Sequence, residues 1–260
     1  MKKILTGLLM MTMLLMVLLP AHAENVFAYP PHTGTDVAAA FAAPAVQPYT
    51  GKNGNQEMAD TIWVYYTDGT FEQFAEADGE VLLFSIGTYE LTGGTGFSDD
   101  PSGTGKGQIT IRREKKYTAD GGLADHNSEA TYKLGTLGFT QLYTPDAERK
   151  AVAVFYGDDK QPWTGEDGQP KMLDTWWIYF SDGSFEQYAV LDNRVILFSQ
   201  GVYELGMNSS FVYGKNGEGT DVITIRRTMK YTKDGLAPYE SSHEYELGKL
   251  GFVRIAAINP

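Results

Sequence analysis

The feature that most constrains this chain is an internal repeat. Residues 60–75 read DTIWVYYTDGTFEQFA, and residues 174–189 read DTWWIYFSDGSFEQYA. A shift of 114 positions aligns Trp63 with Trp177, and the agreement runs without a gap over residues 48–91. More than half of those positions are identical, so the chain contains two copies of one ancestral module.

The length of the repeated unit favours two domains in tandem. Solenoid repeats of about 20–50 residues cannot bury a core alone, whereas units of about 100 residues commonly fold by themselves. We therefore predict one β-domain at residues 36–145 and a second at residues 150–258, joined by a polar, charged linker at residues 144–150. A single pseudo-symmetric barrel built from both copies is the alternative.

Both copies are rich in strand signals and show no helical periodicity. Aromatic and β-branched runs flank Asp68-Gly69 and Asp182-Gly183, and Asp-Gly is favoured in two-residue type I′ hairpins. Gly87 or Gly201, inside a later apolar run, indicates a bulge or a bend of the sheet. We expect six or seven short strands in each copy. The fold class is therefore all-β, with two tandem antiparallel domains, each a curled meander or small barrel, or alternatively a small β-sandwich.

Three short motifs in each copy resemble secreted bacterial lipocalin-like domains. In the first copy they are Asp68-Gly69-Thr70-Phe71, Gly87-Thr88-Tyr89 and Ile109-Thr110-Ile111. The Gly-x-Trp start of lipocalins is not clear at the first strand of either copy. The resemblance covers about half of each repeat, and it implies a small antiparallel barrel with room for a small apolar ligand. It carries over no functional residue.

The N-terminus has the form of a secretory signal. Lys2 and Lys3 precede an apolar run at residues 4–19, and Ala21-His22-Ala23 offers a small-x-small cleavage site. We predict a signal peptide of bacterial type at residues 1–23 and a flexible tail at residues 24–35, with an uncleaved anchor as the alternative. The mature protein would be secreted, periplasmic or part of the cell envelope, without membrane insertion.

Composition limits the partners of the mature chain. The full chain has 21 basic and 33 acidic residues, a formal net charge of −12, and loss of the signal with its two lysines leaves 19 basic residues and a charge of −14. Coulomb repulsion then opposes binding to nucleic acid and to anionic lipid. The chain has no cysteine, so a hydrophobic core rather than disulfides must stabilise it.

Residues for nucleophilic or metal-dependent catalysis are scarce. The chain has no cysteine and no Gly-x-Ser-x-Gly elbow, and its predicted mature part retains only His32, His126 and His243. Neither an HExxH motif nor a paired-cysteine site is present, and the acidic pair Asp158-Asp159 is interpreted as a solvated loop. We predict no enzyme activity, no metal site and no cofactor.

Paired carboxylates are the remaining route to catalysis. The copies share three acidic positions, Asp60/Asp174, Glu72/Glu186 and Glu90/Glu204. Strand parity places Glu72 and Glu90 on an exposed face, the common position of glutamates in strands. A carbohydrate-acting hydrolase, which needs two carboxylates in one cleft, is therefore the least favoured interpretation.

Aromatic residues are the last candidates for a binding site. Trp63, Tyr65, Trp163, Trp177 and Tyr179 either line a ligand pocket or form the core, and core is the commoner position for such side chains. The favoured function is non-catalytic binding of a small molecule, a glycan or a protein. The alternative is a structural or interaction protein of the cell envelope with filled barrels.

Overall fold

A computed structural model describes most of the chain. The described residues are 35–92, 97, 107–120, 122–133, 139–143, 149–165, 168–211, 221–247 and 253–257. The predicted signal peptide at 1–23, almost all of the predicted tail at 24–35 and most of the predicted linker at 144–150 lie outside them. Within the described ranges, no helix combines the length and the apolar character needed to cross a membrane.

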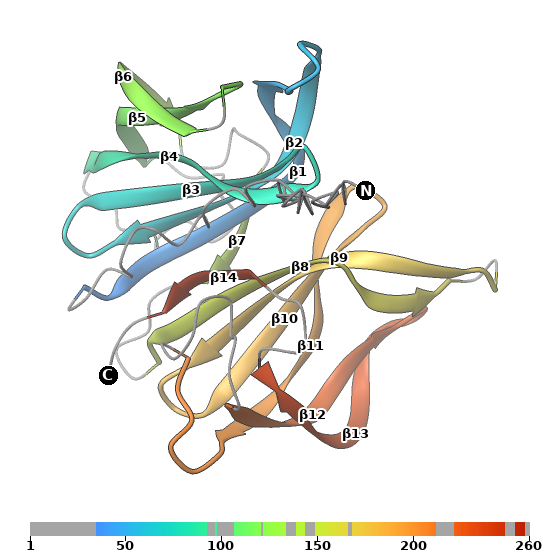
Figure 1. The fold of residues 1–260 in the computed structure, drawn as a ribbon. Coiled ribbons are helices and arrows are strands. Elements are labelled where there is room, and N and C mark those ends of the chain that lie inside the picture. Colours follow the sequence, from blue (N-terminus) through green and yellow to red (C-terminus); the bar gives the residue numbers. More distant parts are fainter. Residues whose placement is uncertain are drawn as a thin grey trace, which may run out of the picture.

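The described residues form two antiparallel sheets, one from each copy (Figure 1). The first sheet contains β1 (Val37–Thr50), β2 (Gln56–Tyr66), β3 (Thr70–Ala77), β4 (Glu80–Thr92), β5 (Gln108–Thr118), β6 (Gly122–Lys133) and β7 (Thr140–Tyr143). The second contains β8 (Ala151–Thr164), β9 (Pro170–Phe180), β10 (Ser184–Leu191), β11 (Arg194–Leu205), β12 (Val222–Thr232), β13 (Gly235–Glu246) and β14 (Val253–Ala257). The strand orders are β6-β5-β4-β3-β2-β1-β7 and β13-β12-β11-β10-β9-β8-β14.

These orders confirm the all-β class and the tandem antiparallel meanders. Each sheet contains seven strands, and several strands are longer than expected, since β1 and β8 each span 14 residues. Neither sheet closes into a barrel among the described residues. The short last strand of each copy pairs with β1 or β8, and no described strand connects it to β6 or β13.

The Asp-Gly hairpins have a different turn from the predicted type I′. Gly69 has a φ of 85° and donates its N–H to the Tyr66 carbonyl oxygen at 3.1 Å, whereas Asp68 does not have a positive φ. This pattern is a type I turn followed by a glycine bulge. The Asp68 carboxylate favours it by accepting the Thr70 N–H at 2.9 Å. A two-residue turn with positive φ at both positions occurs instead at Asp78-Gly79.

Gly87 and Gly201 lie where the backbone of the next strand leaves no room for a side chain. The register of β4 and β5 shifts between Ile86 and Gly87, and that of β11 and β12 shifts at Gly201. A Cβ atom on Gly87 would clash with the carbonyl oxygen of Arg112. The predicted bulge is therefore present, and only glycine allows the sheet to bend there without displacing the next strand.

A buried polar network recurs in both sheets. Gln73 donates its side-chain N–H groups to Gln47 Oε1 at 2.6 Å and to Thr61 Oγ1 at 3.0 Å, and it accepts a hydrogen bond from Ser85 Oγ at 2.7 Å. Gln187 makes the equivalent contacts in the second sheet. Because these buried amides are hydrogen-bonded, they fix the strand register instead of destabilising the core.

Each sheet buries apolar residues on both of its faces. One face carries a core of its own, which includes Trp63 and Phe71 in the first sheet and Trp177 and Phe185 in the second. The opposite faces pack together into one shared core. Its buried members are Val37, Ala40, Ala42, Ile62, Val64, Tyr66, Phe74, Leu83 and Leu142 from the first copy and Ala151, Val154, Tyr156, Trp176, Ile178, Phe180 and Val195 from the second.

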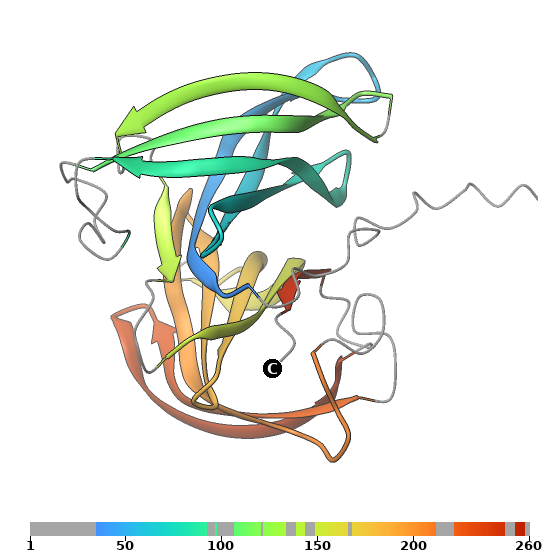
Figure 2. The ribbon, with the colours of Figure 1, turned by 90° about the vertical axis from the view of Figure 1, so that its left-hand side faces the viewer.

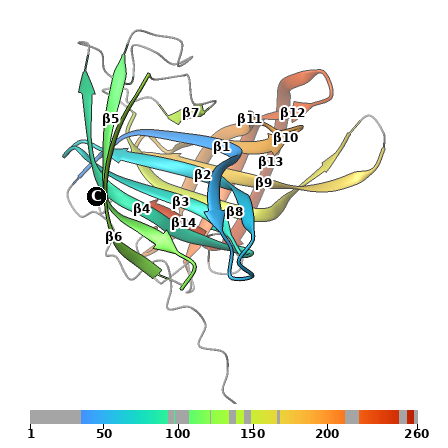
Figure 3. The same cartoon turned by 90° about the horizontal axis from the view of Figure 1, so that it is seen from above.

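We call the region of this shared core the seam. Two curved sheets lie one above the other in Figure 2, and from above the first lies across the second (Figure 3). Polar contacts also cross the seam, because Lys150 Nζ lies 2.6 Å from Asp36 Oδ2 and Tyr156 Oη donates to Glu76 Oε2 at 2.8 Å. The two copies are therefore joined by apolar and polar contacts alike.

Candidate functional site

The structure does not bring the five predicted aromatic residues into one site. Trp63 and Tyr65 are 6% and 8% exposed within the core of the first sheet. Trp177 and Tyr179 are 4% and 3% exposed at equivalent places in the second sheet. Trp163 is half-buried and lies away from them, with its ring against Phe198 and Tyr231. Four of the five are thus core residues by burial.

Two of these core residues also form the floor of a cavity. A space of about 270 Å³ opens on the face of the second sheet that is turned away from the seam. We call it the basic pocket. Its lining residues are Lys160, Gln161, Pro162, Trp177, Tyr179, Ile225, Arg227, Lys230, Tyr239, His243 and Tyr245. The second sheet therefore has an open space on this face beside a closely packed aromatic core.

Strand alternation and one bulge place the cations in this pocket. Ile225 and Arg227 of β12 lie on the same face because side chains alternate along a strand. The register of β12 and β13 then shifts between Arg227 and Met229. This irregularity moves the alternation by one residue, so that Lys230 rather than Met229 lines the pocket. Strict alternation along β12 would have placed Lys230 and Arg227 on opposite faces of the strand.

The cations of the basic pocket lie over aromatic rings. The guanidinium carbon of Arg227 is 5.2 Å from the centre of the Trp177 ring, and Lys230 Nζ is 5.1 Å from the centre of the Tyr239 ring. Both distances are within the range of cation–π attraction. Burial raises the pKa of the Tyr179 hydroxyl, and the nearby Arg227 charge opposes that increase. Tyr179 therefore remains a neutral hydrogen-bonding group.

The pocket has a local charge opposite to that of the whole chain. No aspartate or glutamate is among the described residues that line it. On the other face of β12 the arrangement differs, because Arg226 Nη2 lies 3.4 Å from Glu204 Oε2. The outward arginine thus has a carboxylate partner, while the structure shows aromatic rings next to the inward Arg227 and Lys230. Such a pocket can attract and orient an anion.

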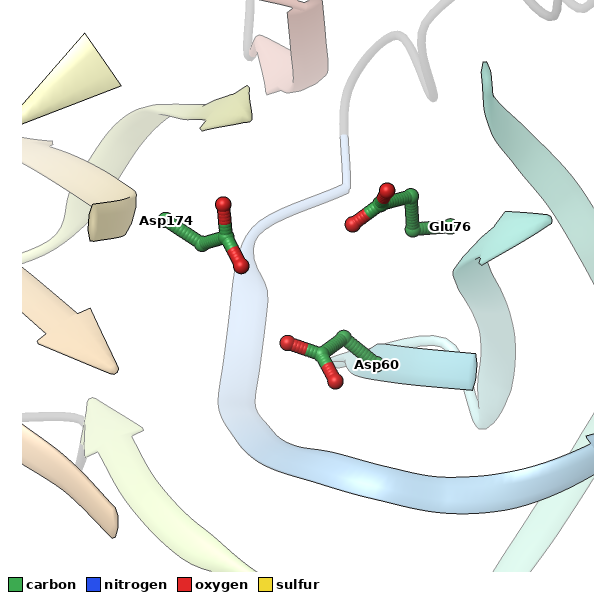
Figure 4. A group of neighbouring side chains, drawn as sticks. All are labelled: Asp60, Glu76 and Asp174. Carbon is green, nitrogen blue, oxygen red and sulfur yellow. The ribbon is translucent and has the colours of Figure 1, made fainter. Parts of the chain in front are cut away.

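A second group of polar residues lies at the seam. Asp60 and Glu76 of the first copy and Asp174 of the second point toward one another (Figure 4), and each offers a carboxylate oxygen within 4.8 Å of the others. Both aspartates stabilise a bulge in the preceding strand. Asp60 accepts the Ala45 N–H at 2.7 Å, and Asp174 accepts the Asp159 N–H at 2.9 Å. The shared core brings the two bulges together.

Burial, together with the neighbouring negative charges, makes these carboxyl groups hard to ionise. Burial, followed by the influence of Asp158 and Glu76, raises the pKa of Asp174 to about 7. Burial is also the main reason that the pKa values of Asp60 and Glu76 are raised. The three oxygens could hold a hard cation such as Ca²⁺. The adjoining cavity, which Asp60 and Glu76 help to line, has a volume of only about 10 Å³, room for a single water molecule.

The parity argument was wrong for one of the shared glutamates. Glu72 is only 8% exposed, and it accepts a hydrogen bond from Tyr66 Oη at 2.7 Å. The face that alternation assigned to solvent is covered by the other copy, because Phe74 on the same face belongs to the shared core. Glu90 is exposed as predicted, and its Oε2 lies 3.2 Å from Arg112 Nη2.

Comparison with known proteins adds no family to this geometry. No protein-family model, no curated protein and no solved structure matches the chain. The resemblance to lipocalin-like domains therefore stays a prediction, and the function is inferred from the pocket.

Proposed function

We propose that the protein is exported and acts as a non-catalytic binding protein, with a small negatively charged ligand held in the basic pocket of the second sheet. One observation supports this proposal above the others. Lys160, Arg227 and Lys230 line the same cavity as several aromatic rings, and no described lining residue is acidic. In a chain with a formal net charge of −12, this local excess of positive charge favours an anion.

The chemistry of the lining also indicates how a ligand would be held. Arg227 can donate two parallel hydrogen bonds to a carboxylate or a sulfate, because its guanidinium is planar and forked. Tyr239 and Tyr245 offer ring faces and hydroxyl groups for a polar ring. The pocket volume of about 270 Å³ is slightly below the usual range for small-molecule sites, roughly 300–1,000 Å³, so the pocket suits a ligand of about one ring.

A scaffold of the cell envelope is the second candidate. The near-complete burial of Trp177 and Tyr179 favours it, because residues at 4% and 3% exposure offer little free surface. Under this interpretation, the cations only cover the aromatic core with their aliphatic stems. The two candidates differ in one outcome, since a scaffold has no preference for a charged ligand over its neutral analogue.

Isothermal titration of the full chain with matched probes separates them. The probes are glucuronate against glucose and 4-hydroxybenzoate against 4-hydroxybenzyl alcohol, pairs in which only one member carries a carboxylate. We expect at least one anion to bind about tenfold more tightly than its neutral partner, because a charge-assisted bond contributes about 1.5–3 kcal/mol. Binding should weaken as the salt concentration rises.

Two variants locate the binding. Arg227→Gln should lower the affinity for the anion by about tenfold, because it removes the forked guanidinium cation. Arg226→Gln is the matched control, since that side chain lies on the opposite face of β12 beside Glu204. Circular dichroism verifies that both variants are folded. Equal affinity for charged and neutral probes, or unchanged affinity in Arg227→Gln, would reject the proposal.

A further inference from the structure

The basic pocket continues into a second hollow. An open groove of about 830 Å³ lies beside it and shares Pro162, Lys230 and Tyr239 with the pocket. The end of β8, the start of β9, the end of β12 and Tyr239 of β13 form this groove, and Trp163 and Tyr231 add aromatic rings to that of Tyr239. We call it the outer groove. Because three residues border both spaces, a ligand longer than one ring can extend from the pocket into the groove.

The outer groove has the same charge as the pocket. Lys171 and Lys233 line it together with the shared Lys230. Among the described residues that line the two spaces, none is an aspartate or a glutamate. In the whole chain, however, 33 acidic residues outnumber 21 basic ones. The positive charge therefore follows the length of the hollow, which suits a ligand with several negative charges.

The lining residues also indicate which chemical class of long ligand fits the two spaces. Ile225 and Met172 are the aliphatic side chains among the described lining residues, apart from prolines, so the surface does not suit an acyl chain. Aromatic rings with hydroxyl and ammonium donors between them suit sugar rings, which have both apolar faces and polar edges. The net charge of −12 opposes every long polyanion, and it opposes least a sugar chain that carries one carboxylate for every two rings, as hyaluronan does.

We infer that the basic pocket and the outer groove together bind an acidic oligosaccharide, with one charged sugar in the pocket and its neighbours along Trp163, Tyr231 and Lys233. This inference rests on the proposed function, because it takes the basic pocket as the site of the first charged ring. It adds that the ligand is a polymer and that the groove contributes separately to its affinity.

Titration with sugars of increasing length tests this inference. The probes are α-1,4-linked galacturonate of one to four residues, hyaluronan fragments of similar length, and an oligothymidylate of four nucleotides. For at least one sugar series we expect about a tenfold gain in affinity from the monomer to the longest chain, because the second contact is intramolecular. Lys233→Glu should remove most of that gain and leave monomer binding unchanged. Lys52→Glu, an exposed lysine of the first copy, is the matched control and should change neither.

The outcomes distinguish this inference from the proposed function. If a monomer binds and longer sugars bind no more tightly, the polymer inference is rejected and the anion pocket stands. If Lys233→Glu weakens the monomer as much as the longest chain, the groove has no separate role and the inference is also rejected. Tighter binding of the oligothymidylate than of any sugar rejects the glycan class. Failure of every anion to bind rejects the inference and the proposed function together.

Discussion

The seam carboxyl groups retain their protons to unusually high pH because burial disfavours their charged forms. The pKa of Asp174 is raised to about 7, while Asp60 and Glu76 shift in the same direction. Each aspartate nevertheless accepts a backbone N–H through one oxygen. The hydrogen-bond acceptor at these positions therefore stabilises the bulge, whereas the negative charge destabilises the seam.

Asp174→Asn should separate these two effects, because asparagine keeps an acceptor oxygen and removes the charge. A carboxyl group whose pKa is raised on folding contributes most to the free energy of unfolding at low pH. This contribution is lost as the pH rises from about 4 to about 7. Since Asp174 is only half-buried, solvent screening reduces the effect, and we expect the variant to gain about 1 kcal/mol at pH 8 and nothing at pH 4. Urea denaturation at both pH values measures it.

Asp120→Asn provides the matched control, because Asp120 is an exposed residue of the β5–β6 turn. A lower free energy of unfolding for Asp174→Asn at pH 8 would show that the carboxylate, and not only its acceptor oxygen, stabilises the fold. That outcome would contradict the assignment of Asp174 as a repelled group.

The two copies differ at individual positions around the pocket. Lys160 and His243 line the basic pocket, and the equivalent positions of the first copy hold Val46 and Ala130. Ala130 pairs with Ile111 as His243 pairs with Ile225, so the strand registers correspond. The second copy therefore has a lysine at the edge of the pocket where the first copy has an apolar residue, whereas the arginine over the tryptophan ring occurs in both copies, as Arg113 over Trp63 and Arg227 over Trp177.

Strands β11 and β12 depend on Gly201 for their close approach. A Cβ atom there would clash with the carbonyl oxygen of Arg226 and come within 2.9 Å of the Arg227 Cα atom. Arg227 itself lines the basic pocket. The packing at this glycine therefore connects the bend of the sheet directly to the position of the proposed anion-binding arginine.

Gly201→Ala should consequently reduce both stability and binding. We expect a loss of about 1–3 kcal/mol in the free energy of unfolding, as for other overpacked sites. The affinity for an anionic probe should also fall, because the Arg227 backbone must move. Gly122→Ala is the control, since a Cβ atom on Gly122 meets nothing within 4 Å. Equal stability of the two variants in thermal unfolding would show that the close approach is not required.

Local chemistry explains which elements the sequence could predict. The hairpins and the glycine bulges depend on neighbouring residues, so alternation and Asp-Gly pairs indicated them correctly. The turn type was wrong because the Asp68 side chain bonds to Thr70, a contact that composition does not reveal. Lys230 was missed because a bulge shifts its face. The aromatic positions Trp177 and Tyr179 were identified, but their role as a pocket floor depends on β13, which is distant in sequence from β9.

The packing of one copy on the other could not be predicted from the repeat. A run such as residues 62–66, whose side chains are buried on both faces of the strand, indicates that other parts of the protein cover both faces. It does not indicate which parts these are. The seam has also diverged between the copies. Tyr156 of the second copy donates a hydrogen bond to Glu76 of the first across the seam. By the repeat, Tyr156 corresponds to Ala42 and Glu76 corresponds to Val190, and both of these residues are apolar. Such complementary differences suit an interface that formed between two particular surfaces.

The shared core determines the arrangement of the whole molecule. It occupies one face of each sheet, with Val64 and Ile178 at 0% exposure, and leaves the other face of the second sheet for the basic pocket. Because each copy would expose this apolar face without its partner, the two copies should unfold as one cooperative unit. The polar contacts Tyr156–Glu76 and Lys150–Asp36 add to the same coupling.

Differential scanning calorimetry of the full chain and of Ile178→Ala tests this coupling most directly. The shared core predicts a single transition whose calorimetric and van't Hoff enthalpies agree. Removing the buried Ile178 side chain should cost about 2–5 kcal/mol and move that entire transition to lower temperature. Two separate transitions, of which only one moves in the variant, would contradict the shared core and show that the copies are independent domains.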